Sequence, residues 1–259
     1  MCRLTAGKPA SRHVASLQKH QSRDMDLLYG LLLFLSSVDE KALLLVNGLH
    51  SPFFDGVMWT VSDKTVWLPL YIFLAVAVCR RHSCRDAVIC LLAVVAAIAA
   101  TDKTCGSLLR PLFGRLRPSN PDNPVAAFVH IVNNYRGGNY GFPSCHAANS
   151  FCLAVYLSLC FRGKRAAVLL FTWAALVSYS RVYLGVHYPG DVIGGMFVGS
   201  VYAVTFFYIY VVAVSESKPA VQAARLMFYN VSRRFGHLQV FAEVLICYVR
   251  KSFRVKRLR

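Results

Sequence analysis

The chain has 259 residues, 56% of them hydrophobic, and a formal net charge of +17 at pH 7. Soluble domains are about 45–50% apolar, so this composition argues against an ordinary soluble domain and favours a membrane protein. The positive charge lies mostly at the two ends: residues 1–25 hold five Lys or Arg and one Asp, and residues 215–259 hold ten Lys or Arg and two Glu.

Basic ends beside apolar stretches favour attraction to anionic lipid headgroups over nucleic-acid binding, for which a folded basic module is typical. We therefore expect three regions: a basic cytoplasmic tail over residues 1–25, a membrane-embedded domain over residues 26–214, and a basic amphipathic cytoplasmic tail over residues 215–259. The expected partner is the lipid bilayer, with no nucleic acid. The sequence leaves the oligomeric state open.

The apolar stretches predict an all-α polytopic membrane bundle of about six transmembrane helices. A helix needs roughly 20 apolar residues to cross about 30 Å of hydrocarbon. The stretches that approach this length are residues 65–79, 86–109, 146–161, 166–185 and 188–214. Residues 26–62 are ambiguous because Asp39, Glu40 and Lys41 interrupt their apolar pattern, and they are expected to supply one further span.

The short loops predict how the bundle is oriented. Residues 79–85 and 161–165 are basic, as are both ends of the chain, and cytoplasmic loops carry an excess of Lys and Arg. The segment 110–143 and the turn near 181–190 then lie together on the opposite side. We expect a multi-pass protein of the inner (cytoplasmic) membrane whose polar site faces the periplasm or exterior.

Polar residues with complementary chemistry are concentrated in these outer segments. They are Arg110, Arg117, Ser144, His146, Arg181, His187 and Asp191. Arginine presents a planar fork of donors that suits phosphate oxygens, and two histidines can divide the work of nucleophile and general acid. A lone histidine in a membrane helix is more often structural, but the joint pattern favours a functional site.

The spacing at the end of this pattern suggests a mechanism. Asp191 lies four residues after His187 and would share a helix face with it, so its carboxylate could accept the Nδ1 proton and leave Nε2 free to attack. Phosphoryl transfer mainly requires clamping and charge stabilisation. Because Asp191 is the only carboxylate within these motifs, we expect a metal-independent reaction without a cofactor.

The three segments resemble the motifs of the type 2 phosphatidic acid phosphatase superfamily, which are Lys-x6-Arg-Pro, Pro-Ser-Gly-His and Ser-Arg-x5-His-x3-Asp. This chain has Arg110-x6-Arg117-Pro118, Pro143-Ser144-Cys145-His146 and Ser180-Arg181-x5-His187-x3-Asp191. Two positions depart from the pattern. Arg110 keeps the charge of lysine with a wider head group, and Cys145 adds a Cβ that would be strained if the backbone there required a positive φ.

The resemblance implies a role for each matched residue. His187 would attack phosphorus and become a phosphohistidine, with Asp191 orienting its ring, and His146 would protonate the leaving oxygen and later activate water. The remaining four matched side chains, Arg110, Arg117, Arg181 and Ser144, would hold the phosphoryl oxygens. Arg115 has no assigned role and is equally compatible with a phosphate contact and a lipid-facing anchor.

An integral membrane lipid phosphatase is therefore the leading expectation. The phrases NGLHSPFF, FGRLRP and SRVYLGVHYPGD are similar to bacterial enzymes that act on undecaprenyl diphosphate or lipid A. Undecaprenyl diphosphate or a phospholipid is the first expected substrate, and lipid A is the alternative. A more remote alternative is a transporter or scaffold that binds lipid phosphate without turnover.

Overall fold

The computed structural model describes residues 10–214, and side chains from residue 25 onward. Within this part all regular structure is helical, which confirms the predicted all-α class. The α-helices are α1 (Ala10–Asn47), α2 (Pro52–Ser62), α3 (Leu68–Cys79), α4 (Cys84–Lys103), α5 (Arg110–Phe113), α6 (Cys145–Phe161), α7 (Lys164–Tyr183) and α8 (Pro189–Val214). A π-helical turn, Thr104–Leu109, joins α4 to α5, and short 3-10 turns lie at Thr65–Trp67, Pro124–Phe128 and Val132–Asn134.

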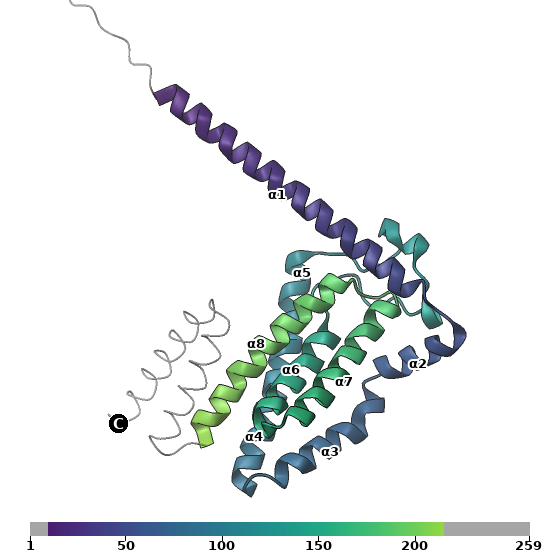
Figure 1. The fold of residues 1–259 in the computed structure, drawn as a ribbon, viewed down its shortest axis with the longest axis vertical. Helices are drawn as coiled ribbons and strands as arrows, with labels where there is room; N and C mark the ends of the chain where they lie inside the picture. The colour runs from purple at the N-terminus through teal and green to yellow at the C-terminus, as the bar shows by residue number, and fades with distance from the viewer. Residues whose placement is uncertain (1–9, 215–259) are drawn as a thin grey trace, which may run out of the picture.

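Helix α6 lies at the centre of the bundle and packs against α4, α7 and α8 (Figure 1). Two glycines of α8 allow the close approach to α6. A Cβ on Gly199 would lie 2.0 Å from the carbonyl oxygen of Ala148, and one on Gly195 would lie 2.4 Å from that of Ser144. Small residues are what let helix backbones approach closely in a membrane, so these positions fix how the start of α6 meets α8.

The predicted number of six spans is not confirmed. Three helical segments are long and apolar enough to cross a membrane: Cys84–Phe113, Lys164–Tyr183 and Pro189–Val214. Helix α2 and the segment Thr65–Cys79 form a pair bent by 68°, which would make a fourth. Helix α6 is apolar but has only 17 residues, and α1 carries charged residues in the middle of its apolar part.

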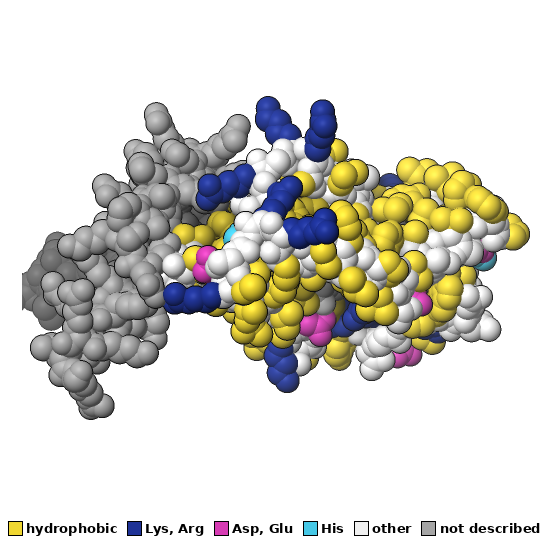
Figure 2. All heavy atoms as spheres, turned by 90° about the horizontal axis from the view of Figure 1, so that it is seen from below, with side chains coloured by type: hydrophobic (Ala, Val, Ile, Leu, Met, Phe, Trp, Pro, Cys, Tyr) yellow, Lys and Arg dark blue, Asp and Glu magenta, His cyan; other side chains and the backbone are white. Residues whose placement is uncertain are grey.

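The two ends of the bundle differ in chemistry. The loops that precede α4 and α7 lie at the lower end in Figure 1, and both are basic. Figure 2, seen from this end, shows several Lys and Arg side chains standing among hydrophobic ones. The segment between α5 and α6 and the α7–α8 turn lie at the other end, so all the predicted polar segments are on the same side of the bundle.

The end of α1 is bound to that side, whereas its earlier turns extend away from the bundle (Figure 1). Asn47 makes the connection: its Nδ2 donates to the carbonyl oxygens of Tyr183 (2.7 Å) and His130 (2.9 Å), and its Oδ1 accepts from the His130 amide (2.7 Å). Asn47 is 1% exposed. One side chain thereby joins α1, α7 and the long outer loop.

Candidate active site

The first motif turns back toward the bundle directly after α5. Gly114 ends that helix with a left-handed backbone (φ 58°), a conformation that glycine adopts without steric cost. The next residues run beside the segment before α6, where the amide of Arg117 donates to the carbonyl oxygen of Asn139 and that of Gly141 donates to the carbonyl of Arg115. This backbone pairing places Arg115 and Arg117 beside the segment that leads into α6.

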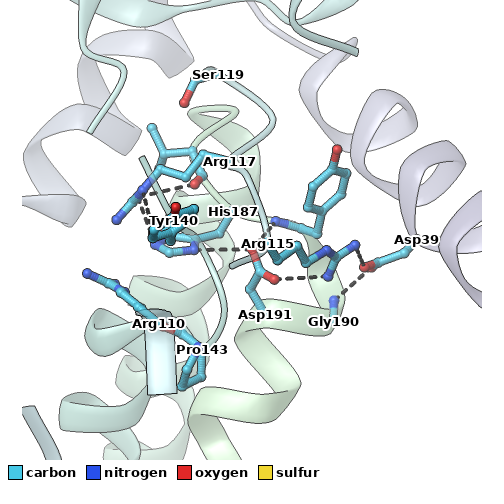
Figure 3. Close-up of polar contacts among 12 residues, drawn as sticks. Asp39, Arg110, Arg115, Arg117, Ser119, Tyr140, Pro143, His187, Gly190 and Asp191 are labelled. Carbon is cyan, nitrogen blue, oxygen red and sulfur yellow. Dashed lines mark hydrogen bonds and ion pairs between the residues drawn. The ribbon is translucent and has the colours of Figure 1, made fainter. Parts of the chain in front are cut away.

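His187 is completely buried between a carboxylate and a guanidinium (Figure 3). Its Nδ1 lies 3.4 Å from Oδ2 of Asp191, and its Nε2 lies 3.0 Å from Nη1 of Arg117. The turn that places it requires Gly185 (φ 70°), where a Cβ would lie 2.3 Å from Cγ1 of Val129. The expected His187–Asp191 contact is therefore present, and the ring nitrogen opposite to it faces an arginine.

Asp191 lies in the first turn of α8 and forms hydrogen bonds through its backbone as well as its side chain. Its Oδ2 also accepts from the Tyr188 amide (3.0 Å), and its Oδ1 accepts from Nη1 of Arg115 (2.9 Å). Its carbonyl oxygen accepts from the Ser144 amide at 2.9 Å. The second and third motifs are thus joined by a backbone hydrogen bond, and both carboxylate oxygens are engaged.

Arg117 is held rigidly beside His187. Its Nε donates to the carbonyl oxygen of Tyr140 and its Nη1 to that of Val186, both at 3.2 Å. Burial, followed by the positive charges of Arg110 and Arg181, lowers the pKa of Arg117 to about 10. The guanidinium therefore remains charged at neutral pH, in a cluster of like charges that an anion would stabilise.

The same cluster acts on the histidine. Burial, followed by the charges of Arg117, Arg181 and Arg110, lowers the pKa of His187 well below its usual value. A backbone hydrogen bond to Gly141 opposes this shift. The ring is therefore neutral at physiological pH, and a neutral imidazole keeps a lone pair on one nitrogen. This is the protonation state that a nucleophile requires.

Two matched side chains have buried polar atoms without a hydrogen-bond partner. They are Oγ of Ser144 and Nε of Arg181, in residues that are 0% and 3% exposed. Arg181 Nη1 donates to Oγ of Ser62. Buried polar groups nearly always have partners, and phosphate oxygens would supply acceptors to both. Arg110 lies at the edge of the group, where its Nε donates to the carbonyl of Pro143 at 3.3 Å.

The departure at Cys145 causes no strain. Cys145 opens α6 and is absent from the positions with positive φ, so the added Cβ is compatible with the backbone. Its side chain is buried in a small cluster with Cys105 and Ala148. The concern raised by the missing glycine therefore does not apply to this chain.

His146, in the first turn of α6, is half-buried and lines a cavity of about 420 Å³. Ser62 and Lys64 lie at the same cavity, and Ser62 also contacts Arg181, which connects His146 to the arginine cluster. Away from this polar end the lining is mostly apolar and comes from α3, α4, α6 and α7. The structure thus brings all seven predicted residues to one end of the bundle.

Two residues at the site were not predicted. Arg115 was expected to contact phosphate or lipid, but it binds Asp191 and, through Nη2, Asp39 of α1 at 2.6 Å. Asp39 was noted only as an interruption of an apolar stretch. The position of Arg115 inside the first motif was a usable signal, whereas nothing in the sequence links Asp39 to a motif that begins about 70 residues later.

Known proteins are similar to this chain in sequence and in fold. A sequence model of the PAP2 superfamily matches residues 87–214. A lipid A 4'-phosphatase of Bacteroides thetaiotaomicron is 45% identical over 176 residues, which cover 68% of this chain and 78% of that protein. The chain belongs to the PAP2 superfamily. A lipid A 4'-phosphatase of Porphyromonas gingivalis is 33% identical over 184 residues, covering 71% of this PAP2 chain and 77% of that protein.

A solved structure supports the fold of this PAP2 protein. The transmembrane PAP2-type phosphatidylglycerolphosphate phosphatase of Bacillus subtilis superposes with a TM-score of 0.52 at 23% sequence identity, covering 71% of this chain and 89% of that one. At this identity the likeness concerns the fold alone. Together, the relatives confirm the predicted family and the predicted class, a membrane lipid phosphatase.

Proposed function

We propose that this PAP2 protein hydrolyses a phosphomonoester of a glycolipid of the lipid A type, on the non-cytoplasmic face of the inner membrane. The observation that carries the reaction is the burial of neutral His187 between Asp191 and Arg117. Asp191 orients the His187 ring, and a phosphate bound by Arg117 would lie beside that ring.

The reaction has two steps. His187 Nε2 attacks phosphorus in line and the bond to the lipid oxygen breaks. His146, which takes up a proton when the phosphate anion binds beside it, gives that proton to the leaving oxygen. A water molecule then attacks the phosphohistidine while His146 takes a proton from it, releasing inorganic phosphate and restoring both histidines. Arg110, Arg117, Arg181 and Ser144 stabilise the charge on the equatorial oxygens, which is the main task of the protein in phosphoryl transfer.

The apolar cavity supports a substrate with a hydrocarbon tail. It begins at His146 and continues between helices as far as Val78 and Leu157. Its volume of about 420 Å³ falls within the usual range of small-molecule sites, about 300–1,000 Å³. A lipid with its phosphate at His187 could place one acyl chain in this cavity while the rest of the molecule remains in the bilayer.

The relatives favour one headgroup. Two lipid A 4'-phosphatases are 45% and 33% identical to this chain, whereas an undecaprenyl-diphosphatase of Sulfolobus acidocaldarius is 33% identical over a smaller share of it, 60%. The proposal therefore places lipid A before undecaprenyl diphosphate, which reverses the order expected from the sequence. The basic loops at the opposite end of the bundle support a site on the non-cytoplasmic face.

Phosphate release by purified full-length protein in detergent tests the proposal. Lipid A, undecaprenyl diphosphate and phosphatidate would each be offered in EDTA, together with His187→Ala. His82→Ala is the matched control, since His82 lies in the basic loop between α3 and α4. We expect release from lipid A by the wild type and His82→Ala but not by His187→Ala.

Other outcomes have definite meanings. Turnover of undecaprenyl diphosphate or phosphatidate alone would retain the reaction and replace the substrate. Loss of activity in EDTA would contradict the metal-independent mechanism. Failure of the folded wild-type protein to hydrolyse any of the three lipids would favour the binding or transport alternative.

A further inference from the structure

Arg115 differs from the other arginines of the site in what it binds. Its guanidinium bridges two carboxylates: Nη1 donates to Oδ1 of Asp191 at 2.9 Å and Nη2 donates to Oδ2 of Asp39 at 2.6 Å (Figure 3). It also lies 4.0 Å from the centre of the Tyr188 ring, a cation–π distance. Both terminal nitrogens are thus engaged by acidic side chains rather than directed toward a phosphate.

Asp39 connects this bridge to two helices. Its second oxygen, Oδ1, accepts from the amide of Gly190 at 2.7 Å, in the first turn of α8. A Cβ at Gly190 would lie 2.7 Å from Oδ2 of Asp39, so only glycine leaves room for the carboxylate at this distance. Asp39 therefore fixes the start of α8 and the guanidinium of Arg115 at the same time.

The bridge controls the orientation of the Asp191 carboxylate. Oδ2 must point toward Nδ1 of His187, and it does so while Oδ1 is held by Arg115. Without Arg115, Oδ1 would lose its charged donor, and rotation of the carboxylate would no longer be opposed by an ion pair. Charge-assisted hydrogen bonds of this kind supply geometric specificity as well as energy.

We propose that Asp39 and Arg115 are positioning residues, which act on His187 through Asp191. The chain of contacts Asp39–Arg115–Asp191–His187 extends from α1 to the His187 ring, which contacts no other carboxylate among the described residues. This inference rests on the proposed function, since it assigns a role within that reaction. It also assigns a role to α1, a helix outside the matched motifs.

Four variants test the role of the bridge. Arg115→Gln and Asp39→Asn each remove one charge and retain a similar shape, Arg115→Lys retains the charge, and Asp39→Asn/Arg115→Gln removes both. Asp26→Asn is the matched control because Asp26 is an exposed acidic residue on the same helix. Lipid A hydrolysis is measured in full-length protein well below the melting temperature of each variant.

We expect kcat to fall about 10–100-fold in Arg115→Gln and Asp39→Asn, by analogy with the hydrogen-bond partners of metal-binding histidines, whose removal costs this much. KM should change less than about twofold, because the phosphate-binding arginines are untouched. The double variant should lose no more kcat than the single variant with the larger loss, as expected for residues that act through one network. Arg115→Lys should recover part of the rate, and Asp26→Asn should match the wild type.

A binding measurement provides a readout that does not depend on turnover. In the proposed site vanadate would form a bond to the attacking nitrogen, whereas inorganic phosphate would be held by the arginines and Ser144 without that bond. Calorimetry on Arg115→Gln and Asp39→Asn should therefore show vanadate affinity reduced about tenfold and phosphate affinity unchanged. An equal loss of both ligands would overturn the proposal in favour of a direct phosphate contact or a purely structural role.

The kinetic outcomes separate this proposal from the function on which it rests. Full kcat in Arg115→Gln and Asp39→Asn, beside an active wild type, would overturn the positioning role and leave the proposed function intact. A rise in KM with unchanged kcat would instead assign Arg115 to the headgroup. An inactive wild type would contradict the proposed function, and the ratio of vanadate to phosphate affinity would then decide the positioning role.

Discussion

Arg117 and His187 are in direct contact, with Nη1 of the arginine 3.0 Å from Nε2 of the histidine. A guanidinium nitrogen only donates, so this contact requires the histidine nitrogen to present its lone pair. The histidine tautomer that suits the arginine is therefore the one with its proton on Nδ1, facing Asp191. A bound phosphate would take over the Arg117 donor and leave the same lone pair directed at phosphorus.

The protonation of Arg117 predicts how the enzyme responds to alkaline pH. Its pKa is lowered to about 10, so its charge is complete at neutral pH and is lost as the pH rises through about 10. We expect kcat/KM to decline across that interval, since this parameter reports groups of the free enzyme. Arg117→Lys should move the decline to lower pH, because lysine has a lower intrinsic pKa.

A pH profile of kcat/KM for lipid A, with enzyme stability checked at each pH, is the measurement. Arg136→Lys is the control, since Arg136 lies in the outer loop, where its Nη1 donates to the carbonyl oxygen of Ser119. An alkaline limb at the same pH in the wild type and Arg117→Lys would show that another group produces it.

His146 is predicted to act in both chemical steps, and the two actions can be separated by the leaving group. With a lipid substrate, His146→Ala should reduce kcat about 10²–10⁴-fold, the usual contribution of a general acid or base. With p-nitrophenyl phosphate the leaving group needs no acid, so phosphorylation of His187 should stay fast and only its hydrolysis should be slow.

Rapid-mixing kinetics would then show a burst of p-nitrophenol, close to one equivalent per enzyme, in His146→Ala. His187→Ala should show no burst because it lacks the attacking nitrogen. A His146→Ala variant that is slow from the first turnover with both substrates would place His146 in phosphate binding or in the structure instead.

The apolar cavity predicts a variant that separates lipids from soluble substrates. Leu153 lines the cavity on α6, so Leu153→Trp would occupy part of the space available to an acyl chain. We expect kcat/KM for lipid A to fall about tenfold or more, since a loss of about 1.4 kcal/mol of binding corresponds to tenfold. Hydrolysis of p-nitrophenyl phosphate should be unaffected.

Leu169→Trp is the control for this substitution, because Leu169 is 71% exposed on α7 and faces away from the packed interior. Equal losses on both substrates in Leu153→Trp would indicate distortion of the site. Equal kcat/KM for lipid A in both Trp variants would show that no tail enters the cavity.

The contact between α6 and α8 predicts a stability effect. The Cβ introduced by Gly199→Ala would lie 2.0 Å from a backbone oxygen of Ala148, so the helices would have to separate. Overpacking of this kind costs about 1–3 kcal/mol. Gly56→Ala in α2 is the control, with no atom within 4 Å of the added Cβ. Thermal unfolding in detergent should show a lower melting temperature for Gly199→Ala alone.

The sequence was sufficient to predict which motif residues the fold brings together. His187 lies two residues before α8 and Asp191 lies in its first turn, and their four-residue spacing predicted the contact. The arginines could be assigned to one side because two apolar stretches separate their segments. The all-α class followed from the length of the apolar stretches.

Other features could not be predicted because they depend on contacts between distant parts of the chain. Asp39 and Arg115 are 76 residues apart, and neither has a spacing that would indicate its partner. The number of spans was also beyond the sequence, since a stretch of apolar residues does not reveal that α2 and the following segment are bent by 68°.

The cavity below His146 has a further consequence, because it follows α6 only as far as Leu157. Three turns of helix separate these two residues, about 16 Å of rise. In the proposed reaction the phosphorus lies at His187, so the length of the cavity limits how much hydrocarbon it can hold. Lipids with identical headgroups and different acyl lengths should therefore be hydrolysed at different rates, and the enzyme would select its substrates partly by the length of their acyl chains.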